Sequence, residues 1–196
     1  MAGSPDLREV LSGPVEEVAP RLLGAVLRHG PVALRLTEVE AYGGTSDPGS
    51  HAYRGPTPRT RVMFGPPGHL YCYLSHGIHT CANVSAGPDG HASAVLLRAG
   101  EVVDGVEAAR ARRGAVRDHL LARGPGNLCR ALGIRLDHDG VDLVDGEVTL
   151  CLGDPVPAFD RGPRTGLRQA ADHPWRFWLP GDPTVSPYRR HKSAAP

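Results

Sequence analysis

Lysine and aromatic residues are scarce in this chain. Lys192 is the only lysine among 22 Lys and Arg residues, and aromatic residues make up 5% of the 196 positions. The formal net charge is only +1, and neither terminus forms a basic tail. The composition therefore excludes a polybasic nucleic-acid-binding arm, and any nucleic-acid contact must come from a local patch.

Long apolar stretches are absent as well. No run approaches the roughly 18 apolar residues of a membrane span, and no signal peptide opens the chain. The four cysteines lack the CxxC spacing of metal or redox motifs, and each lies in or beside an apolar run, as buried, reduced thiols do. We therefore expect a cytoplasmic protein that does not bind membranes.

The length fits one domain, and 25 glycines and 19 prolines predict many turns and few long helices. Predicted strands outnumber helices and follow one another closely, which indicates an α+β domain with a mostly antiparallel sheet. We expect a loose N-terminus over 1–13, one domain over 14–187 and a flexible tail over 188–196. The strands are expected at 25–29, 32–40, 70–74, 78–85, 92–99, 164–167 and 176–179, with a hairpin over 141–152. The helices are expected at 15–23, where Pro20 interrupts, at 57–64 as a single turn, at 103–112 and at 127–132.

One carboxylate stands out at the end of a predicted strand. Glu40 is followed by Tyr42 and two glycines, and Glu38 shares its strand face because it lies two residues away. A carboxylate beside a flexible loop can deprotonate water. The alternative is an ordinary solvated glutamate at a strand end.

Five aromatic or imidazole rings cluster after this strand, at Tyr42, His51, Tyr53, Tyr71 and Tyr73. Alternation along a strand places Tyr71 and Tyr73 on one face. Such rings can sandwich a nucleobase, although they can equally cap a small core.

A short turn, residues 75–79, separates two predicted strands. A polar ring at His76 followed by the apolar Ile78 could enter a minor groove and unstack a base pair, or could form an ordinary turn. His76 and His79 are three residues apart, so on a strand they face opposite ways, and no acidic or thiol ligand is suitably spaced. We expect no metal at this turn.

Three arginines, Arg54, Arg59 and Arg61, flank two prolines just before this region. Proline stiffens the turn and holds the guanidinium groups outward at low entropic cost. The pattern fits phosphate contact and a solvated arginine face equally well.

Taken together, these residues resemble the alkyladenine (3-methyladenine) DNA glycosylase family. The matching segments are 38–42 (EVEAY), His51, 57–61 (TPRTR), 63–64 (MF), 67–73 (PGHLYCY), Gly77, 83–85 (NVS), 89–90 (DG) and 95–99 (VLLRA). Weaker similarity continues through 124–125, 128–129, 164–166 and 175–177, so that the resemblance covers about 15–187. Each short match is weak, but the ordered set is specific.

The resemblance implies a monofunctional glycosylase of base excision repair. Such an enzyme flips alkylated or deaminated purines from double-stranded DNA and hydrolyses the N-glycosidic bond without metal or cofactor. The implied fold is a curved, open-barrel-like antiparallel sheet with flanking helices and a β-hairpin inserted in the minor groove. A monomer is the default expectation.

The resemblance also implies residue roles. Glu40 would be the general base, and Arg98 would position the water together with a backbone carbonyl near Thr165. Tyr42 would stack on one face of the base, His51 and Tyr73 on the other, and Asn83 would disfavour guanine at the pocket floor. The expected DNA-contacting and wedge residues are Arg59, Arg61, Met63, Tyr71, His76, Gly77, Ile78 and His79.

One position departs from the family pattern. Family members carry a tyrosine at the hairpin tip, where this chain has His76, whose smaller ring predicts weaker flipping of neutral, well-stacked lesions. No lysine lies near these motifs, so a Schiff-base lyase step is not expected. A non-catalytic nucleic-acid-binding module is the main alternative, and a metal-dependent hydrolase using the histidines is a third.

Overall fold

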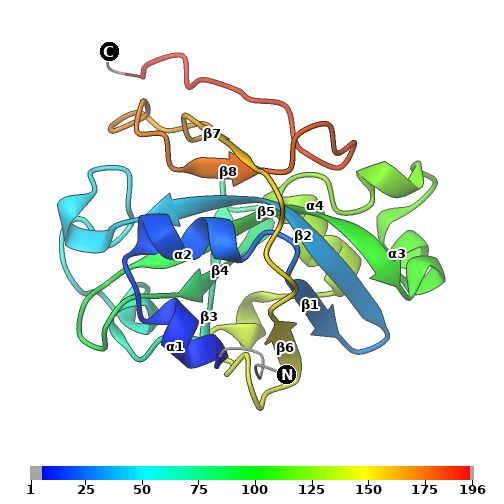
Figure 1. Cartoon of the computed structure of the whole chain (residues 1–196), viewed down its shortest axis with the longest axis horizontal. Coiled ribbons are helices and arrows are strands. Elements are labelled where there is room, and N and C mark those ends of the chain that lie inside the picture. The colour runs from blue at the N-terminus through cyan, green and yellow to red at the C-terminus, as the bar shows by residue number, and fades with distance from the viewer. Residues whose placement is uncertain (1–5, 195–196) are drawn as a thin grey trace.

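A single eight-stranded antiparallel sheet forms the centre of the molecule (Figure 1), in a computed structural model that describes residues 6–194. The main path runs β3-β4-β5-β2-β1-β6, and β8 pairs with β2 while β7 pairs with β8. The strands are β1 (Val26–His29), β2 (Val32–Tyr42), β3 (Leu70–Ser75), β4 (His79–Ser85), β5 (Ala94–Asp104), β6 (Val148–Cys151), β7 (Asp160–Gly162) and β8 (Arg176–Trp178). The predicted single α+β domain with a mostly antiparallel sheet is confirmed.

The long strand β2 explains how the sheet curls. Its first half pairs with β1, while the second half pairs with β8 on the same edge. Its other edge follows β5, with register shifts between Leu36 and Glu38 and between Glu38 and Val39. Such irregularities bend a strand and increase its twist, so the sheet forms a half-barrel around its core.

Four short α-helices flank the sheet: α1 (Leu7–Leu11), α2 (Val15–Arg21), α3 (Val106–Arg113) and α4 (Pro125–Leu132). In Figure 1, α1 and α2 lie in front of the sheet, and α4 lies behind it. Single 3₁₀ turns occur at η1 (Gly44–Ser46), η2 (Arg61–Phe64), η3 (Asp118–Leu120) and η4 (Leu136–His138). Within the described residues, no helix combines the length and apolar character needed to cross a bilayer.

The core is built from the inward faces of these elements. Buried apolar residues of α2, β2, β5 and α4 join one cluster that includes Leu22, Leu36, Leu97 and Leu128. Pro125 is well placed at the first position of α4, because its ring fixes φ near the helical value. Gly133, at φ 76°, ends that helix. A smaller cluster under the 52–64 loop contains Met63 and Tyr71 and borders the cavity described below.

Several predictions of local structure were wrong. The stretch 7–11, expected to be loose, is helix α1, because Asp6 caps it and Leu11 is fully buried; the expectation for residues 1–5 lies outside the described part of the chain. Pro20 does not interrupt α2, since it lies close to the C-terminal end of the helix. The helix expected from 103 starts only at 106, because β5 continues to Asp104.

The expected hairpin over 141–152 is also wrong. Only β6 forms there, and its partner is β1, which is far away in sequence. Residues 164–167 are a loop, not a strand, and β7 lies just before them. In the tail, residues 188–194 have no regular secondary structure, and the Gly166 N–H donates to the Arg189 carbonyl; residues 195–196 are outside the described range.

Candidate active site

One row of side chains crosses four strands on a single face of the sheet. Glu40 on β2 lies opposite Leu96 on β5, Leu96 lies opposite Asn83 on β4, and Asn83 lies opposite Tyr71 on β3. Residues directly opposite in a ladder point to the same side. The sheet register alone therefore brings together residues up to 56 positions apart in the sequence, Glu40 and Leu96.

A cavity of about 510 Å³ lies over this row. Its walls come from the four strands and from three loops, at 49–51, 59–63 and 165–167. The lining residues are Tyr42, Gly49, Ser50, His51, Arg59, Met63, Tyr71, Tyr73, Leu74, Ser75, His76, Cys81, Asn83, Leu96, Arg98, Pro125, Thr165, Gly166 and Leu167. The volume falls within the range of about 300–1,000 Å³ typical of small-ligand pockets.

Glu40 lies directly behind the wall of this cavity. Its carboxylate is fully buried and accepts three contacts from residues that line the cavity. The Thr165 N–H donates to Oε1 at 2.7 Å, while the Tyr42 hydroxyl at 2.9 Å and Arg98 Nη1 at 3.2 Å face Oε2. The alternative of a solvated strand-end glutamate is therefore wrong.

Arg98 is held in place by a second buried carboxylate. Glu38 Oε1 accepts from Nε of both Arg98 and Arg176 at 2.7 Å, and Ser186 donates to Glu38 through its N–H and its hydroxyl. Burial by itself would raise the pKa of Glu38, but Arg98 and Arg176 outweigh it and lower that pKa. For Arg98, burial opposes the charge, yet Glu40 and then Glu38 raise its pKa. Arg98 therefore stays cationic and links Glu38 to Glu40.

The aromatic residues of β3 form one wall. The Tyr71 and Tyr73 rings stack with centroids 5.8 Å apart, and the His51 ring meets Tyr73 edge-on at 4.6 Å. His51 Nδ1 lies 3.2 Å from the Tyr71 hydroxyl. Desolvation and the nearby Arg59 guanidinium lower the pKa of His51 to about 4, so its ring is neutral at pH 7. The related Tyr53 is 46% exposed and does not line the cavity.

Tyr42 is fixed on β2, which two strands, β4 and β5, separate from β3 in the sheet order. The guanidinium of Arg164 lies 4.7 Å from the centre of the Tyr42 ring and pairs with Asp47, both side chains being fully buried. Arg164 also donates to the Ala41 carbonyl at 2.9 Å. This pair ties the 43–50 loop to the 164–167 loop and orients Tyr42 toward the cavity.

The floor of the cavity includes two β4 residues. Asn83 is 4% exposed and donates through Nδ2 to the Tyr71 carbonyl at 3.0 Å, which leaves its Oδ1 available to a ligand. Cys81 lies opposite Tyr73 in the ladder and is buried. Burial raises the pKa of the Cys81 thiol, so it is not a reactive thiolate at neutral pH.

The β3–β4 hairpin forms part of the rim. His76 (φ 51°) and Gly77 (φ 73°) are consecutive left-handed residues, and the Ile78 N–H donates to the Ser75 carbonyl. Ile78 is 72% exposed, an unusual exposure for an isoleucine. Of the predicted tip residues, only His76 lines the cavity, and His79 lies against Gly126 of α4.

Of the predicted arginines, too, one lines the cavity and another does not. Arg59 lines the cavity with its guanidinium 5.5 Å from the centre of the Tyr73 ring, and the buried Met63 lines it as well. Arg61 is exposed and lies outside the cavity wall. The Thr165 N–H contacts Glu40, and the part expected of a backbone carbonyl near Thr165 in positioning the water stays a prediction.

Sequence reasoning missed the residues that hold the site together, namely Asp47, Arg164, Arg176 and Ser186. Arg164 and Arg176 lie in the weaker matching segments 164–166 and 175–177, but the sequence predicts no role for any of the four, whose partners lie 117 to 148 positions away. Leu96 and Cys81 were missed because they look like ordinary strand residues.

The matching family model describes a DNA glycosylase, an enzyme class of DNA repair, and it spans residues 9–183. The chain belongs to the methylpurine-DNA glycosylase (MPG) family.

Bacterial relatives match over most of their own length. A protein of Cutibacterium acnes is 55% identical, with 90% of this chain and 96% of that protein covered. Relatives from Nocardia farcinica and Streptomyces avermitilis are 59% and 54% identical, covering 90% and 96% of this chain and 88% and 93% of the relatives. All three carry the name "Putative 3-methyladenine DNA glycosylase".

Proposed function

We propose that this protein is a monomeric, monofunctional glycosylase that removes alkylated or deaminated purines from duplex DNA. The lesion class is 3-methyladenine, 7-methylguanine, hypoxanthine and ethenoadenine. The observation that carries the proposal is the Glu40 carboxylate, fully buried behind an aromatic-walled cavity of about 510 Å³.

The cavity walls suit a flat ring that has left the DNA stack. Tyr42, His51 and Tyr73 all line the cavity, and we propose that Tyr42 stacks on one face of a flipped base and His51 and Tyr73 on the other. Methylation at N3 or N7 makes a purine cationic, and a cation is attracted to tyrosine faces. The neutral His51 ring adds no like charge to that contact.

Asn83 supports discrimination at the floor. Its Nδ2 is engaged by the Tyr71 carbonyl, so Oδ1 faces a base as an acceptor or as a steric block. We propose that this side chain disfavours the exocyclic amino group of normal guanine.

Glu40 is placed to activate the water. A carboxylate offers about four acceptor positions on its two oxygens, and Thr165, Tyr42 and Arg98 occupy three. The fourth can accept a proton from water that enters between the cavity-lining neighbours. The same negative charge stabilises the oxocarbenium-like sugar as the glycosidic bond breaks, and general-base catalysis is typically worth roughly 10²–10⁴-fold.

The hairpin tip would fill the gap left by the flipped base. His76 and the exposed Ile78 protrude next to the cavity mouth, where a wedge must sit to replace the vacated stacking. Arg59 and Arg61 would contact the phosphates, with Gly77, His79 and Tyr71 shaping the interface. No lysine lines the cavity, and Lys192 is in the C-terminal tail, so a Schiff-base lyase step has no amine.

The test is release of free bases from methylated duplex DNA in EDTA, with unmethylated duplex as the control. The proposal predicts free 3-methyladenine and abasic sites that break only on alkali treatment. Strand breaks without alkali would contradict the monofunctional assignment. DNA binding without any base release would favour the non-catalytic binding module instead.

A further inference from the structure

We propose that His29, His138 and Glu147 form a zinc site at the end of the sheet farthest from the glycosylase cavity. One ligand atom from each residue lies within 4.8 Å of the other two. None of the three lines the cavity, and β1 and β6 end the sheet path that β3 begins. The site is therefore independent of the proposed catalytic residues.

Three segments converge to build it. His29 is the last residue of β1 and pairs with Val148 of β6, so Glu147, just before β6, lies beside it. His138 ends the η4 turn that follows α4. Figure 1 shows β1 and β6 side by side at the lower right of the molecule.

The two imidazoles already have the spacing of zinc ligands. Their Nε2 atoms are 3.3 Å apart, and the rings meet at 82°. Zinc bonds histidine nitrogen at about 2.0–2.1 Å, so two tetrahedral ligands stand about 3.3–3.4 Å apart. Glu147 Oε1 is 3.9 Å from His138 Nε2, and its 63% exposed side chain is free to move closer to both imidazoles.

Contacts at the Nδ1 atoms, on the far side of each ring from the proposed ion, orient both imidazoles. His29 Nδ1 lies 2.9 Å from the Leu132 carbonyl, which can only accept, so Nδ1 carries the proton and the Nε2 lone pair is free for a metal. His138 Nδ1 lies 3.1 Å from both the Asp137 carboxylate and the Arg135 N–H. Without metal, Nδ1 accepts from Arg135 and Nε2–H donates to His29. With zinc, Nε2 would become a ligand and its proton would move to Nδ1, where Asp137 would accept it and the hydrogen bond from the Arg135 N–H would be lost.

The donor set matches zinc in chemistry and access. Two imidazoles and a carboxylate suit this borderline cation, and the exposed Glu147 leaves a fourth position for solvent and a route for the ion. Binding would pin the 133–147 segment to β1. Since zinc would bind the folded chain and not the unfolded chain, it would raise thermal stability without serving the reaction.

The test is calorimetric titration of the metal-free, untagged full chain with Zn²⁺, alongside Co²⁺ absorption as a report of tetrahedral geometry. We expect one ion per chain and a Tm rise of about 5–10 °C at a hundredfold excess over Kd. Glu147→Gln and His29→Gln should each weaken binding at least about tenfold. The control His91→Gln, which changes an exposed loop histidine, should bind as the wild type does.

Two results would overturn the proposal. One is no saturable Zn²⁺ binding to the wild type. The other is equal binding by wild type, Glu147→Gln and His29→Gln, once circular dichroism shows that all are folded. Base release in EDTA is expected to be the same for wild type and Glu147→Gln, which separates this site from the glycosylase proposal.

Discussion

Glu40 and Glu38 lie two residues apart on β2 and are both fully buried, yet they do different things. Glu38 accepts from two arginines and from Ser186, and of these three partners only Arg98 lines the cavity. Glu40 contacts three residues that do line the cavity. Buried carboxylates need such donors, because an unpaired buried charge is very costly. The surroundings of the two carboxylates therefore separate a positioning residue, Glu38, from the proposed general base, Glu40.

Replacing Glu38 should damage stability more than replacing a surface partner. Glu38→Gln leaves Arg98 and Arg176 with a weakened buried partner, and we expect a loss of about 3–5 kcal/mol in the free energy of unfolding. The matched control on the neighbouring strand is Glu101→Gln, whose side chain is 53% exposed beside Arg35 and should cost under about 1 kcal/mol. Denaturant titration measures both.

The difference in stability between wild type and Glu38→Gln should change with pH in one direction only. Because the folded-state pKa of Glu38 is lowered, its contribution is present above the unfolded-state pKa and is lost as the pH falls through the folded-state value. The gap between wild type and Glu38→Gln should therefore shrink in acid. A gap that grew in acid, or equal losses for Glu38→Gln and Glu101→Gln, would contradict this account.

His51 gives a second prediction at the residue scale. After desolvation, Arg59 is the other cause of its lowered pKa, so Arg59→Gln should raise the His51 pKa toward its usual value, as followed by NMR titration of the imidazole. The lowered pKa also means that the unfolded chain takes up this proton first, so the contribution of His51 to stability falls as the pH drops from 6.5 to about 4. A His51 pKa unchanged in Arg59→Gln would show that the charge does not act on the ring.

Most of the candidate site could be predicted from residue types and their spacing in the sequence. The motifs at 38–42, 71–73 and 95–99 identify Glu40, Tyr42, Tyr71, Tyr73 and Arg98, and the structure brings all of them to one cavity or its wall. Asp47 and Arg164 could not be found this way. Their pairing depends on two loops meeting across 117 positions, and no local pattern encodes that contact.

At the scale of elements, the tight turn of the β3–β4 hairpin exposes the side chain at its tip. Two successive residues with positive φ, at His76 and Gly77, reverse the chain tightly and push Ile78 into solvent. Glycine adopts such a conformation freely, whereas His76 does so at a cost of roughly 1–2 kcal/mol. A strained, exposed tip beside the cavity is consistent with a role in DNA contact.

The wedge hypothesis predicts opposite effects of two substitutions at one position. His76→Tyr should speed hypoxanthine release and His76→Ala should slow it, each by roughly fivefold for about 1 kcal/mol of stacking. Both variants keep an L-residue at the same positive φ, so backbone strain is matched. Single-turnover release of hypoxanthine measures the effect, and unchanged rates in both variants would end the hypothesis.

Strand positions were predicted well even where the partner is distant, as for β5 and β8, which both pair with β2, but the pairing of the 141–152 stretch was not. β3, β4 and β1 with β2 follow alternating apolar patterns and form hairpins with their neighbours. The 141–152 hairpin failed because β6 finds β1 at the sheet edge, leaving Asp142 and Gly146 in a turn. Short helix α1 was missed because five residues give too little periodicity to read.

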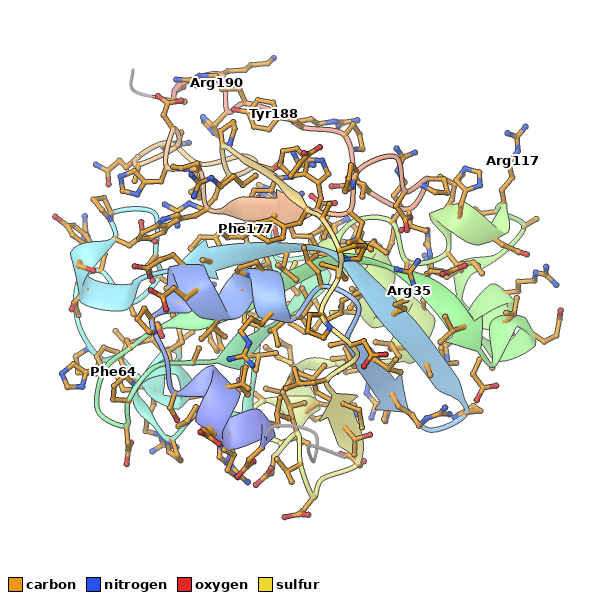
Figure 2. All side chains as sticks on the ribbon, viewed as in Figure 1. Arg35, Phe64, Arg117, Phe177, Tyr188 and Arg190 are labelled. Atoms are coloured by element: carbon orange, nitrogen blue, oxygen red, sulfur yellow. The ribbon has the colours of Figure 1, made fainter. Side chains whose placement is uncertain are left out.

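At the scale of the whole molecule, the charge distribution limits how DNA can be held. The net charge is +1, and arginines close to the cavity must supply the phosphate contacts. The C-terminal segment is also rich in arginine, and Figure 2 shows Arg190 at the outer edge of the molecule, well away from Phe64 beside the 52–64 loop. A small set of contacts predicts modest non-specific affinity and a shallow salt dependence.

Arg61 provides the test of that picture. Arg61→Gln should weaken duplex binding uniformly across sequences and reduce the slope of log affinity against log salt by about one. Arg28→Gln removes the same charge from β1, where Arg28 pairs with Asp104, and should leave the slope unchanged. Equal slopes for Arg61→Gln and wild type would place the phosphate contacts elsewhere.

The central claim is that a water activated by Glu40 cleaves the glycosidic bond. Its most direct test is the single-turnover rate of 3-methyladenine release by wild type and Glu40→Gln, with duplex affinity measured in parallel. The account predicts that Glu40→Gln binds damaged DNA about as tightly as wild type and releases the base roughly 10²–10⁴-fold more slowly. A Glu40→Gln protein that folds, binds and releases the base at the wild-type rate would contradict it.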